Sequence, residues 1–227
     1  MADQVLNDAT VTSGARPAPY EEYLALPHQG RLIEWVNGEV IYHMPPTLPH
    51  QYLADFLTTL LKLFVDFFAL GRVISAPAEM KCGPDGPSRE PDVLFLANAN
   101  LSRTTGEKRI EGPADLVVEI VSDDSVSRDF DDKFIEYQEC GVLEYWIVDP
   151  RPRRKRALFY QRSEEGILES VLPEAGHIYR SNAMPGFWLK VDWLWDMPDV
   201  QLTFAEIAGF SQATLAELRE AKRQRPG

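Results

Sequence analysis

The chain has 227 residues, of which 44% are hydrophobic and 11% aromatic, enough to bury one substantial core without disulfides or a structural metal. Its 23 lysine and arginine residues face 35 aspartate and glutamate residues, which gives a net charge of −12. Such a charge repels a polyphosphate backbone at long range and argues against a simple nucleic-acid-binding module. It does not exclude a hydrolase with an acidic metal site, because a bound cation inverts the local field.

The cysteine count and the N-terminal sequence both indicate a cytoplasmic protein. The two cysteines, Cys82 and Cys140, are too few for a disulfide framework; we expect both in the core, although two thiols can still pair. The first residues are acidic and polar, where a secretory signal has a basic start and an apolar stretch. We therefore expect no association with a membrane.

The composition along the chain predicts one domain with short tails. Residues 1–18 are expected to form a disordered or loosely ordered tail, residues 19–210 a single domain, and residues 211–227 a polar helix or tail. The sequence shows no internal repeat, no low-complexity run and no boundary of a second domain.

The first expected elements are a short helix, a hairpin and a long helix. Residues 19–26 can form the short helix, and residues 31–44 alternate around Asn37-Gly38, a strong signal for a two-residue hairpin turn. Apolar residues then recur at three- and four-residue steps within residues 52–71. Three charged residues interrupt this stretch and predict an amphipathic core helix instead of a membrane span: Asp55, Lys62 and Asp66.

The next elements are short apolar runs that predict strands. They lie at residues 72–77, 78–82, 92–97 and 116–122. Residues 125–141 have a serine cap, acids in the first turn and a terminal glycine, which predict a helix.

A strand at residues 143–149 follows and pairs with residues 156–162. Weaker patterns at residues 177–181 and 187–195 suggest late strands or a packed terminal segment, and residues 214–225 a polar helix. This order predicts a mixed α/β fold, with a mixed central β-sheet flanked by helices and an N-terminal β-hairpin.

Two carboxylates at strand ends are the most informative residues. Glu119 interrupts a strand that otherwise consists of buried residues, where an uncompensated charge costs several kcal/mol. Asp92 stands at the entrance of another strand, directly after Pro91. Two carboxylates on neighbouring strands can present hard oxygen ligands to Mg²⁺ or Mn²⁺, and no Cys/His cluster offers a zinc site. We therefore predict that Asp92 and Glu119 hold a metal.

The helix after the Glu119 strand adds a base to these acids. Lys133 lies in that helix, and its ammonium can reach back over the end of the strand. Asp129 and Tyr137 lie one turn on either side of Lys133, on the same helix face. Asp92, Glu119 and Lys133 together form the predicted catalytic set.

The segments around these residues resemble the PD-(D/E)XK nuclease superfamily: EPDVLFL, LVVEIVSDDS, and a lysine-bearing helix that ends in YQECGVLEYWIVDP. Within that superfamily the chain resembles the Uma-two family of restriction-endonuclease-like proteins. EWVNGEV is similar to that family's opening hairpin, PPTLPHQ to its helix entrance, and MPGFWLKVDWLW to its C-terminal segment. The resemblance covers roughly residues 19 to 196.

The resemblance implies a restriction-endonuclease-like core in which Asp92 and Glu119 hold the metal. Val121 stands where the superfamily motif has a lysine, two residues after its glutamate. Lys133 would then be a migrated replacement for that lysine. Glu34 matches the family's hairpin glutamate, and Glu34 and His50 are further candidates for contacts to metal, water or phosphate.

Several other polar and aromatic residues have a structural and a functional interpretation. Tyr137 can equally be a core residue, and Glu90 is expected to be solvated unless it joins an acidic rim beside Asp92. The basic turn can contact phosphates or be a solvated loop; its candidates are Arg151, Arg153 and Arg154. Three tryptophans are expected in the core or a dimer interface: Trp188, Trp193 and Trp195.

Three functions follow as hypotheses. The first is a Mg²⁺- or Mn²⁺-dependent endonuclease that hydrolyses DNA and forms a homodimer. The second is a non-catalytic, nuclease-like scaffold that acts by dimerisation or partner binding. The third is a metal-dependent hydrolase of small phosphoesters, which suits the net charge better than long DNA does.

Overall fold

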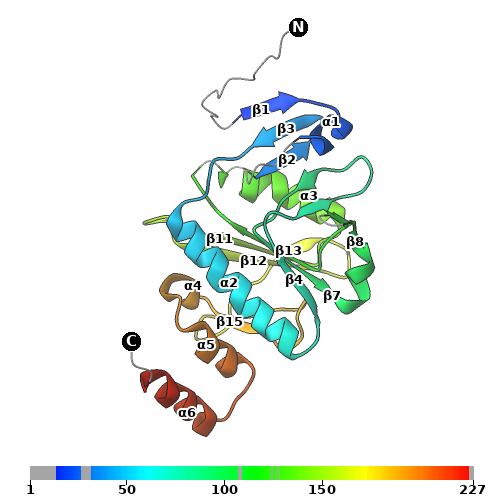
Figure 1. Ribbon diagram of the computed structural model, residues 1–227. Coiled ribbons are helices and arrows are strands. Elements are labelled where there is room, and N and C mark those ends of the chain that lie inside the picture. The colour runs from blue at the N-terminus through cyan, green and yellow to red at the C-terminus, as the bar shows by residue number, and fades with distance from the viewer. Residues whose placement is uncertain (1–13, 27–31, 107–108, 124, 127, 225–227) are drawn as a thin grey trace.

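The computed structural model of the chain describes residues 14–26, 32–106, 109–123, 125–126 and 128–224. Its centre is a mixed six-stranded sheet in the order β13-β12-β11-β10-β7-β4 (Figure 1). In chain order the strands are β4 (Gly71–Ser75), β7 (Val93–Ala97), β10 (Leu116–Ile120), β11 (Glu144–Asp149), β12 (Arg156–Arg162) and β13 (Leu168–Ser170). Strands β10 and β11 are parallel, and the other neighbours are antiparallel. The predicted mixed sheet is confirmed.

Helices cover both faces of this sheet. Helix α2 (Leu48–Phe67) begins at the N-cap Thr47 and buries its apolar side in one core cluster with Val118 of β10. Helix α3 (Lys133–Cys140) follows one turn of π-helix, η2 (Arg128–Asp132), and its Tyr137 packs with Val117 in the other cluster. Because side chains alternate along a strand, Glu119 lies on the α3 face of β10.

A second sheet, which the sequence analysis did not foresee, extends the predicted hairpin. Its order is β1-β3-β2-β6-β5-β9-β8. Asn37 and Gly38 join β2 and β3 with φ values of 50° and 83°, as a two-residue hairpin turn with positive φ at both positions requires. The strands are β1 (Gly14–Pro17), β2 (Ile33–Val36), β3 (Glu39–Tyr42), β5 (Glu79–Lys81), β6 (Ser88–Arg89), β8 (Thr104–Thr105) and β9 (Arg109–Glu111).

The C-terminal part packs at the end of the molecule away from the hairpin (Figure 1). It contains β14 (Ile178–Arg180), β15 (Trp188–Lys190), α4 (Trp193–Asp196), α5 (Val200–Ile207) and α6 (Gln212–Arg223). The strand expected over residues 187–195 was therefore too long, because α4 begins at Trp193. All three tryptophans are partly buried against the main core, which confirms the core interpretation.

The buried carboxylate of Glu144 fastens this C-terminal part to β11. One of its oxygens accepts hydrogen bonds from the Trp146 indole at 2.7 Å and the Tyr179 hydroxyl at 2.8 Å. The other accepts from Ser181 Oγ at 3.0 Å and from the backbone N–H groups of Asn182 and Ala183 at 2.8 and 2.9 Å. A fully hydrogen-bonded carboxylate of this kind is a structural anchor.

Two short helices and the described ends of the chain make up the rest of the structure. Helix α1 (Tyr20–Leu24) connects β1 to β2, and the 3₁₀ helix η1 (Asn98–Arg103) connects β7 to β8. Residues 1–13 and 225–227 lie outside the described residues, whereas Gly14–Pro17, expected in the tail, pair with β3. Among the described helices, none has the length and apolar character to cross a membrane.

The expectation that both cysteines are core residues is confirmed only in part, because Cys82 packs against the second core cluster whereas Cys140 is not among the described residues of that cluster. The alternative that the two thiols pair is the one that the structure bears out. Cys82 and Cys140 form a disulfide with a Cα–Cα distance of 5.2 Å, and both are only half-buried. The bond joins the segment after β5 to the last residue of α3. It therefore links the second sheet to the helix that carries Lys133.

Candidate active site

The sheet register brings the two predicted metal ligands together. Strands β7 and β10 are antiparallel, with Val118 opposite Val93, so the next step of the register places Glu119 opposite Asp92. The backbone N–H of Ile120 donates to Asp92 Oδ2 at 2.7 Å. This hydrogen bond holds the Asp92 carboxylate at the end of the Glu119 strand.

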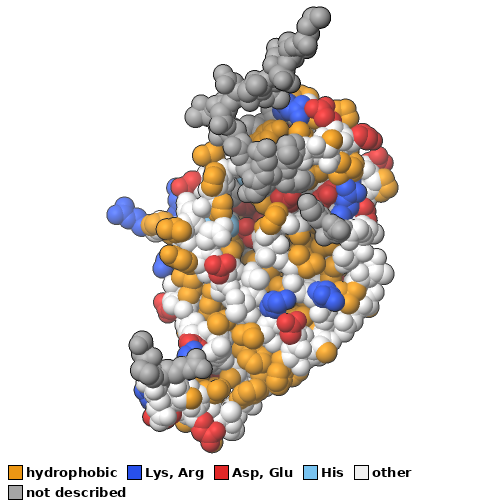
Figure 2. All heavy atoms as spheres, viewed as in Figure 1, with side chains coloured by type: hydrophobic (Ala, Val, Ile, Leu, Met, Phe, Trp, Pro, Cys, Tyr) orange, Lys and Arg blue, Asp and Glu red, His pale blue; other side chains and the backbone are white. Residues whose placement is uncertain are grey.

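A pocket of about 300 Å³ opens over these two carboxylates, and its lining includes Asp92, Glu119 and Lys133. In Figure 2, acidic and histidine atoms are recessed in the upper centre of the molecule, beside the N-terminal end of α2. His50, in the first turn of α2, lines the same pocket and lies 3.3 Å from Asp92 Oδ1 through its Nε2. The predicted catalytic residues thus come from three elements and meet at one pocket.

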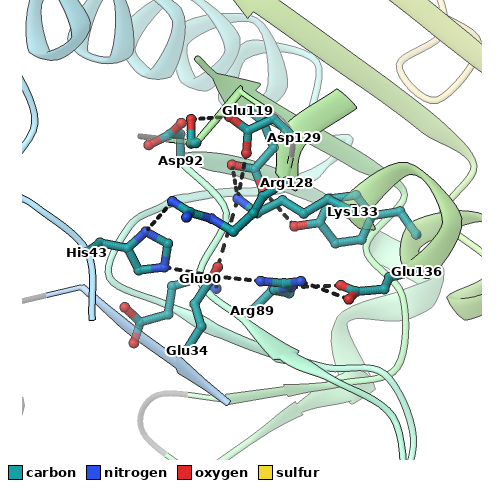
Figure 3. Close-up of polar contacts among 12 residues, drawn as sticks. Glu34, His43, Arg89, Glu90, Asp92, Glu119, Arg128, Asp129, Lys133 and Glu136 are labelled. Atoms are coloured by element: carbon teal, nitrogen blue, oxygen red, sulfur yellow. Dashed lines mark hydrogen bonds and ion pairs between the residues drawn. The ribbon is translucent and has the colours of Figure 1, made fainter. Parts of the chain in front are cut away.

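Lys133 and Tyr137 reach back from α3 to the Glu119 carboxylate. The Lys133 Nζ lies 2.9 Å from Glu119 Oε2 and 3.1 Å from Asp129 Oδ1, as the labelled side chains in Figure 3 show. The Tyr137 hydroxyl donates to Glu119 Oε1 at 2.6 Å. Glu119, Asp129 and Lys133 have side chains no more than 4% exposed. Tyr137 is therefore both a core residue and a neighbour of the site.

Glu34 connects the hairpin to the same group of charges. Its Oε2 lies 2.8 Å from both His43 Nε2 and an Arg89 guanidinium nitrogen, and its Oε1 lies 3.9 Å from Lys133 Nζ. Arg89 also pairs through Nε and its other terminal nitrogen with both oxygens of Glu136 on α3, each at 2.7 Å (Figure 3). Arg89 therefore bridges the second sheet and the lysine-bearing helix.

The environment shifts the pKa values of these acids in opposite directions. Burial, together with the negative charges of Asp129 and Asp92, raises the pKa of Glu119 to about 8, although Lys133 opposes the rise. Burial also acts to raise the pKa of Glu34, but Lys133 and Arg89 outweigh it and hold that pKa well below its usual value. The Glu34 carboxylate is therefore held in its ionised form by Lys133 and Arg89, whereas burial favours the protonated form of Glu119.

Three residues of this network were missed or misassigned from the sequence. Glu90 is buried and lines the pocket together with Asp92, so it is not solvated, and the alternative that it joins an acidic rim beside Asp92 is confirmed. Burial and the nearby Glu34 raise its pKa to about 8. Arg89 precedes it and is 1% exposed, but a lone arginine in a turn-rich segment carries no signal of burial. His43, which lines the pocket, follows the second hairpin strand. The sequence pattern predicted only that it ends the hairpin, without a role at the site.

The side chains at the pocket fit a hard divalent cation that retains water molecules as some of its ligands. The sheet register sets Asp92 opposite Glu119, and burial, with a smaller contribution from Asp129 and Asp92, raises the pKa of Glu119, so a cation bound there would favour the ionised carboxylate. Within the described ranges, no three His, Cys, Asp or Glu side chains form a cluster that could hold a metal alone. Mg²⁺ commonly binds through one or two carboxylates and retains several waters.

The predicted phosphate contacts divide into one neutralised arginine and two exposed ones. Arg151 pairs with Asp149 at 2.8 Å and with Asp123 at 3.4 Å. Arg153 and Arg154 are exposed in the turn between β11 and β12 and form no ion pair with another described residue. This turn projects at the left of Figure 1, where Figure 2 shows Lys and Arg atoms protruding from the surface.

Comparison with known proteins supports the class suggested by this geometry. A crystal structure described as a "putative nuclease" from Anabaena variabilis is similar, with a TM-score of 0.65 and 17% identity. The match covers 79% of this chain and 98% of that chain, so the two share a fold. No curated protein sequence matches the chain.

The mixed sheet, the flanking helices and this likeness define a nuclease-like fold. Residues 20–192 match the Uma2 family, described as "Putative restriction endonuclease". The chain belongs to this family, as its hairpin, its EPDVLFL and LVVEIVS strands and its lysine-bearing helix led us to expect.

Proposed function

We propose that the chain is a Mg²⁺- or Mn²⁺-dependent endonuclease that hydrolyses phosphodiester bonds of DNA. The observation that carries the proposal is the convergence of Asp92, Glu119 and Lys133 at one pocket in a member of this family. These residues are far apart in the sequence and come from β10, α3 and the entrance of β7. Two adjacent acids with one buried lysine suit phosphoryl chemistry, in which charge must be balanced at a transferring phosphate.

In this mechanism the carboxylates of Asp92 and Glu119 would hold the metal, which lowers the pKa of a bound water when present. The Ile120 N–H and His50 orient the Asp92 carboxylate. The Lys133 ammonium, held between Glu119 and Asp129, would donate to a non-bridging phosphate oxygen and offset charge that develops there. Tyr137 fixes the orientation of Glu119 through its hydroxyl.

Plasmid nicking in the presence of Mn²⁺ tests this proposal. We expect Asp92→Asn and Glu119→Gln each to reduce the nicking rate at least about 100-fold, since each removes a ligand charge at the reacting centre. Two exposed acids serve as matched controls, and Asp196→Asn and Glu139→Gln should retain the wild-type rate. Nicking that persists in EDTA, or in both site variants, would refute a metal site at these carboxylates.

A hydrolase of small phosphoesters is the second candidate. The net charge of −12 and the pocket of about 300 Å³ favour it, because a small ligand avoids the repulsion that long DNA meets. Turnover of a chromogenic phosphodiester without any plasmid nicking would favour this candidate.

A non-catalytic scaffold is the third candidate, and one feature supports it. Both oxygens of Glu119 already have partners, Tyr137 and Lys133. A scaffold predicts no metal binding and an unchanged function after Asp92 and Glu119 are converted to amides. The homodimer stays a prediction, which sedimentation equilibrium can test.

A further inference from the structure

Building on the proposed endonuclease function, we infer that the site acts on single-stranded DNA in preference to base-paired DNA. The first observation is the depth of the reacting groups. Side chains of Glu119 and Lys133 are 3% and 4% exposed, and that of Asp92 is 16% exposed. A phosphate must therefore enter the pocket to reach them.

The size of the pocket restricts what can enter. Its volume of about 300 Å³ lies at the lower end of pockets that hold one small ligand, which run from about 300 to 1,000 Å³. A duplex is stiff, with a persistence length of about 50 nm, and its deformation costs energy. An unpaired strand rotates freely about its backbone and can present one nucleotide at a time, whereas a paired nucleotide must first be extruded from the stack.

Exposed apolar and aromatic surface lies at Met44 on the pocket and continues onto the neighbouring first turns of α2, where unpaired bases can use it. Met44 lines the pocket and is 47% exposed. Leu48 and Tyr52 are 67% and 58% exposed and lie four residues apart on α2, on a row that continues to Asp55 at the pocket wall. Exposed aromatic rings stack on unpaired bases without sequence preference. In a duplex the base faces are already stacked on each other.

Positive charge lies on the turn between β11 and β12, which an ion pair connects to the segment that follows β10. Arg151 at the start of this turn pairs with Asp123, the neighbour of the pocket residue Ser122. Beyond it, Arg153 and Arg154 are exposed and lack ion-pair partners among the described residues. Basic residues combined with stacking surface characterise proteins that bind single strands.

The overall charge favours the same substrate. Double-stranded DNA carries one negative charge per roughly 1.7 Å of its axis, a higher density than a single strand has. A protein with a net charge of −12 therefore repels a duplex more strongly. Two unneutralised arginines offset this repulsion more readily for one strand than for two.

The test compares one fluorescein-labelled oligonucleotide in three forms: single strand, blunt duplex, and duplex with an unpaired tail. With wild-type protein and Mn²⁺ we expect cleavage of the single strand to be at least about tenfold faster than that of the duplex, since pairing and stacking must be broken first. Cuts in the tailed duplex should fall in the tail. Equal or faster cleavage of the blunt duplex would overturn the inference while supporting the proposed endonuclease.

Absence of cleavage in all three forms would contradict the proposed function, and binding then decides the inference separately. Fluorescence anisotropy of the same oligonucleotides with wild-type protein in EDTA and low salt gives the affinities. Tighter binding of the single strand supports the inference. Equal or tighter binding of the duplex, or no binding of either form, overturns it.

Two variants, with one control variant, test the surface that the inference uses. Arg153→Ser with Arg154→Ser should reduce the slope of log affinity against log salt by about 1.4, or ~0.7 for each lost phosphate contact to a single strand. Arg219→Ser with Arg223→Ser removes the same charge from α6 and should leave the slope unchanged. Tyr52→Ala should weaken single-strand binding at least about fivefold. An unchanged salt slope in the Arg153→Ser, Arg154→Ser variant together with unchanged affinity in Tyr52→Ala would overturn the assignment of this surface.

Discussion

At the scale of single residues, Lys133 is the cation on which the buried acids depend. Its ammonium lies within 4 Å of Glu119, Asp129 and Glu34, and burial at this depth leaves little water to screen them. We expect Lys133→Met to lower the free energy of unfolding by about 3–5 kcal/mol, because it leaves uncompensated buried charge. Urea denaturation at neutral pH measures the loss.

Two further variants distinguish charge balance from lost packing in this prediction. Adding Asp129→Asn to Lys133→Met removes one of the stranded charges and should recover part of the stability. Lys62→Met breaks an exposed pair with Asp66 and should change the free energy of unfolding by less than about 0.5 kcal/mol. If Lys133→Met were as harmless as Lys62→Met, the charge balance described here would be wrong.

Asp149 gives a pH-dependent prediction outside the pocket. Burial acts to raise its pKa, but hydrogen bonds from Arg151 outweigh burial and lower it. A lowered pKa in the folded state stabilises the protein above the unfolded value near 3.8, and this contribution is lost as pH falls through the folded pKa. Asp149→Asn should therefore cost about 1–2 kcal/mol at pH 7, and the difference should shrink below about pH 3.8.

Unfolding midpoints of wild type and Asp149→Asn at several pH values test this sign. Asp123→Asn is the matched control, because Asp123 also pairs with Arg151 but has a side chain that is 93% exposed. It should have little effect at any pH. A difference between wild type and Asp149→Asn that grew toward acid pH would contradict the assigned direction.

At the scale of elements, the disulfide is the covalent link between the second sheet and α3. It closes a loop with a sequence separation of 58 residues. Reduction, or Cys82→Ser with Cys140→Ser, should lower the free energy of unfolding by about 2–4 kcal/mol, because the open loop has more freedom when unfolded. Urea unfolding with and without reductant measures this. Two titratable thiols in untreated, denatured protein would show that the bond does not form.

The elements with long or regular patterns were predictable from the sequence. The Asn37-Gly38 turn, the periodic helix α2 and the apolar runs of β7 and β10 each carry a local signal. Strand β5 lies within the strand predicted at residues 78–82. Strands β6 and β8 have two residues each and β9 has three, too few to show a period. Their sheet is held by pairings between distant segments, which a local pattern does not encode.

The candidate site also contains residues that were predictable from the sequence and residues that were not. Asp92 and Glu119 were recognisable because a carboxylate within or beside an apolar strand is anomalous, and the register then places them together. Arg89 and His43 were not recognisable, because their importance comes from contacts with Glu34, made across the fold. Burial of a polar side chain in a loop depends on tertiary packing, which no local sequence pattern reports.

At the scale of the whole molecule, the fold reconciles an acidic chain with the proposed site for phosphate chemistry. The net charge is −12, yet the acids nearest the pocket are balanced by Lys133 and Arg89 in the interior. The negative charge that is left without a cation partner is concentrated around Glu119, where burial and neighbouring acids raise the pKa of the carboxyl group to about 8. A divalent cation would neutralise this remaining negative charge, so the proposed function depends first on metal binding.

Calorimetric titration of Mn²⁺ tests that claim most directly, with wild type and the Asp92→Asn, Glu119→Gln double variant compared and plasmid nicking measured on the same samples. We expect wild type to bind Mn²⁺ and nick plasmid, and the double variant to do neither. Undiminished Mn²⁺ binding by the double variant, or nicking by wild type without any metal, would contradict it.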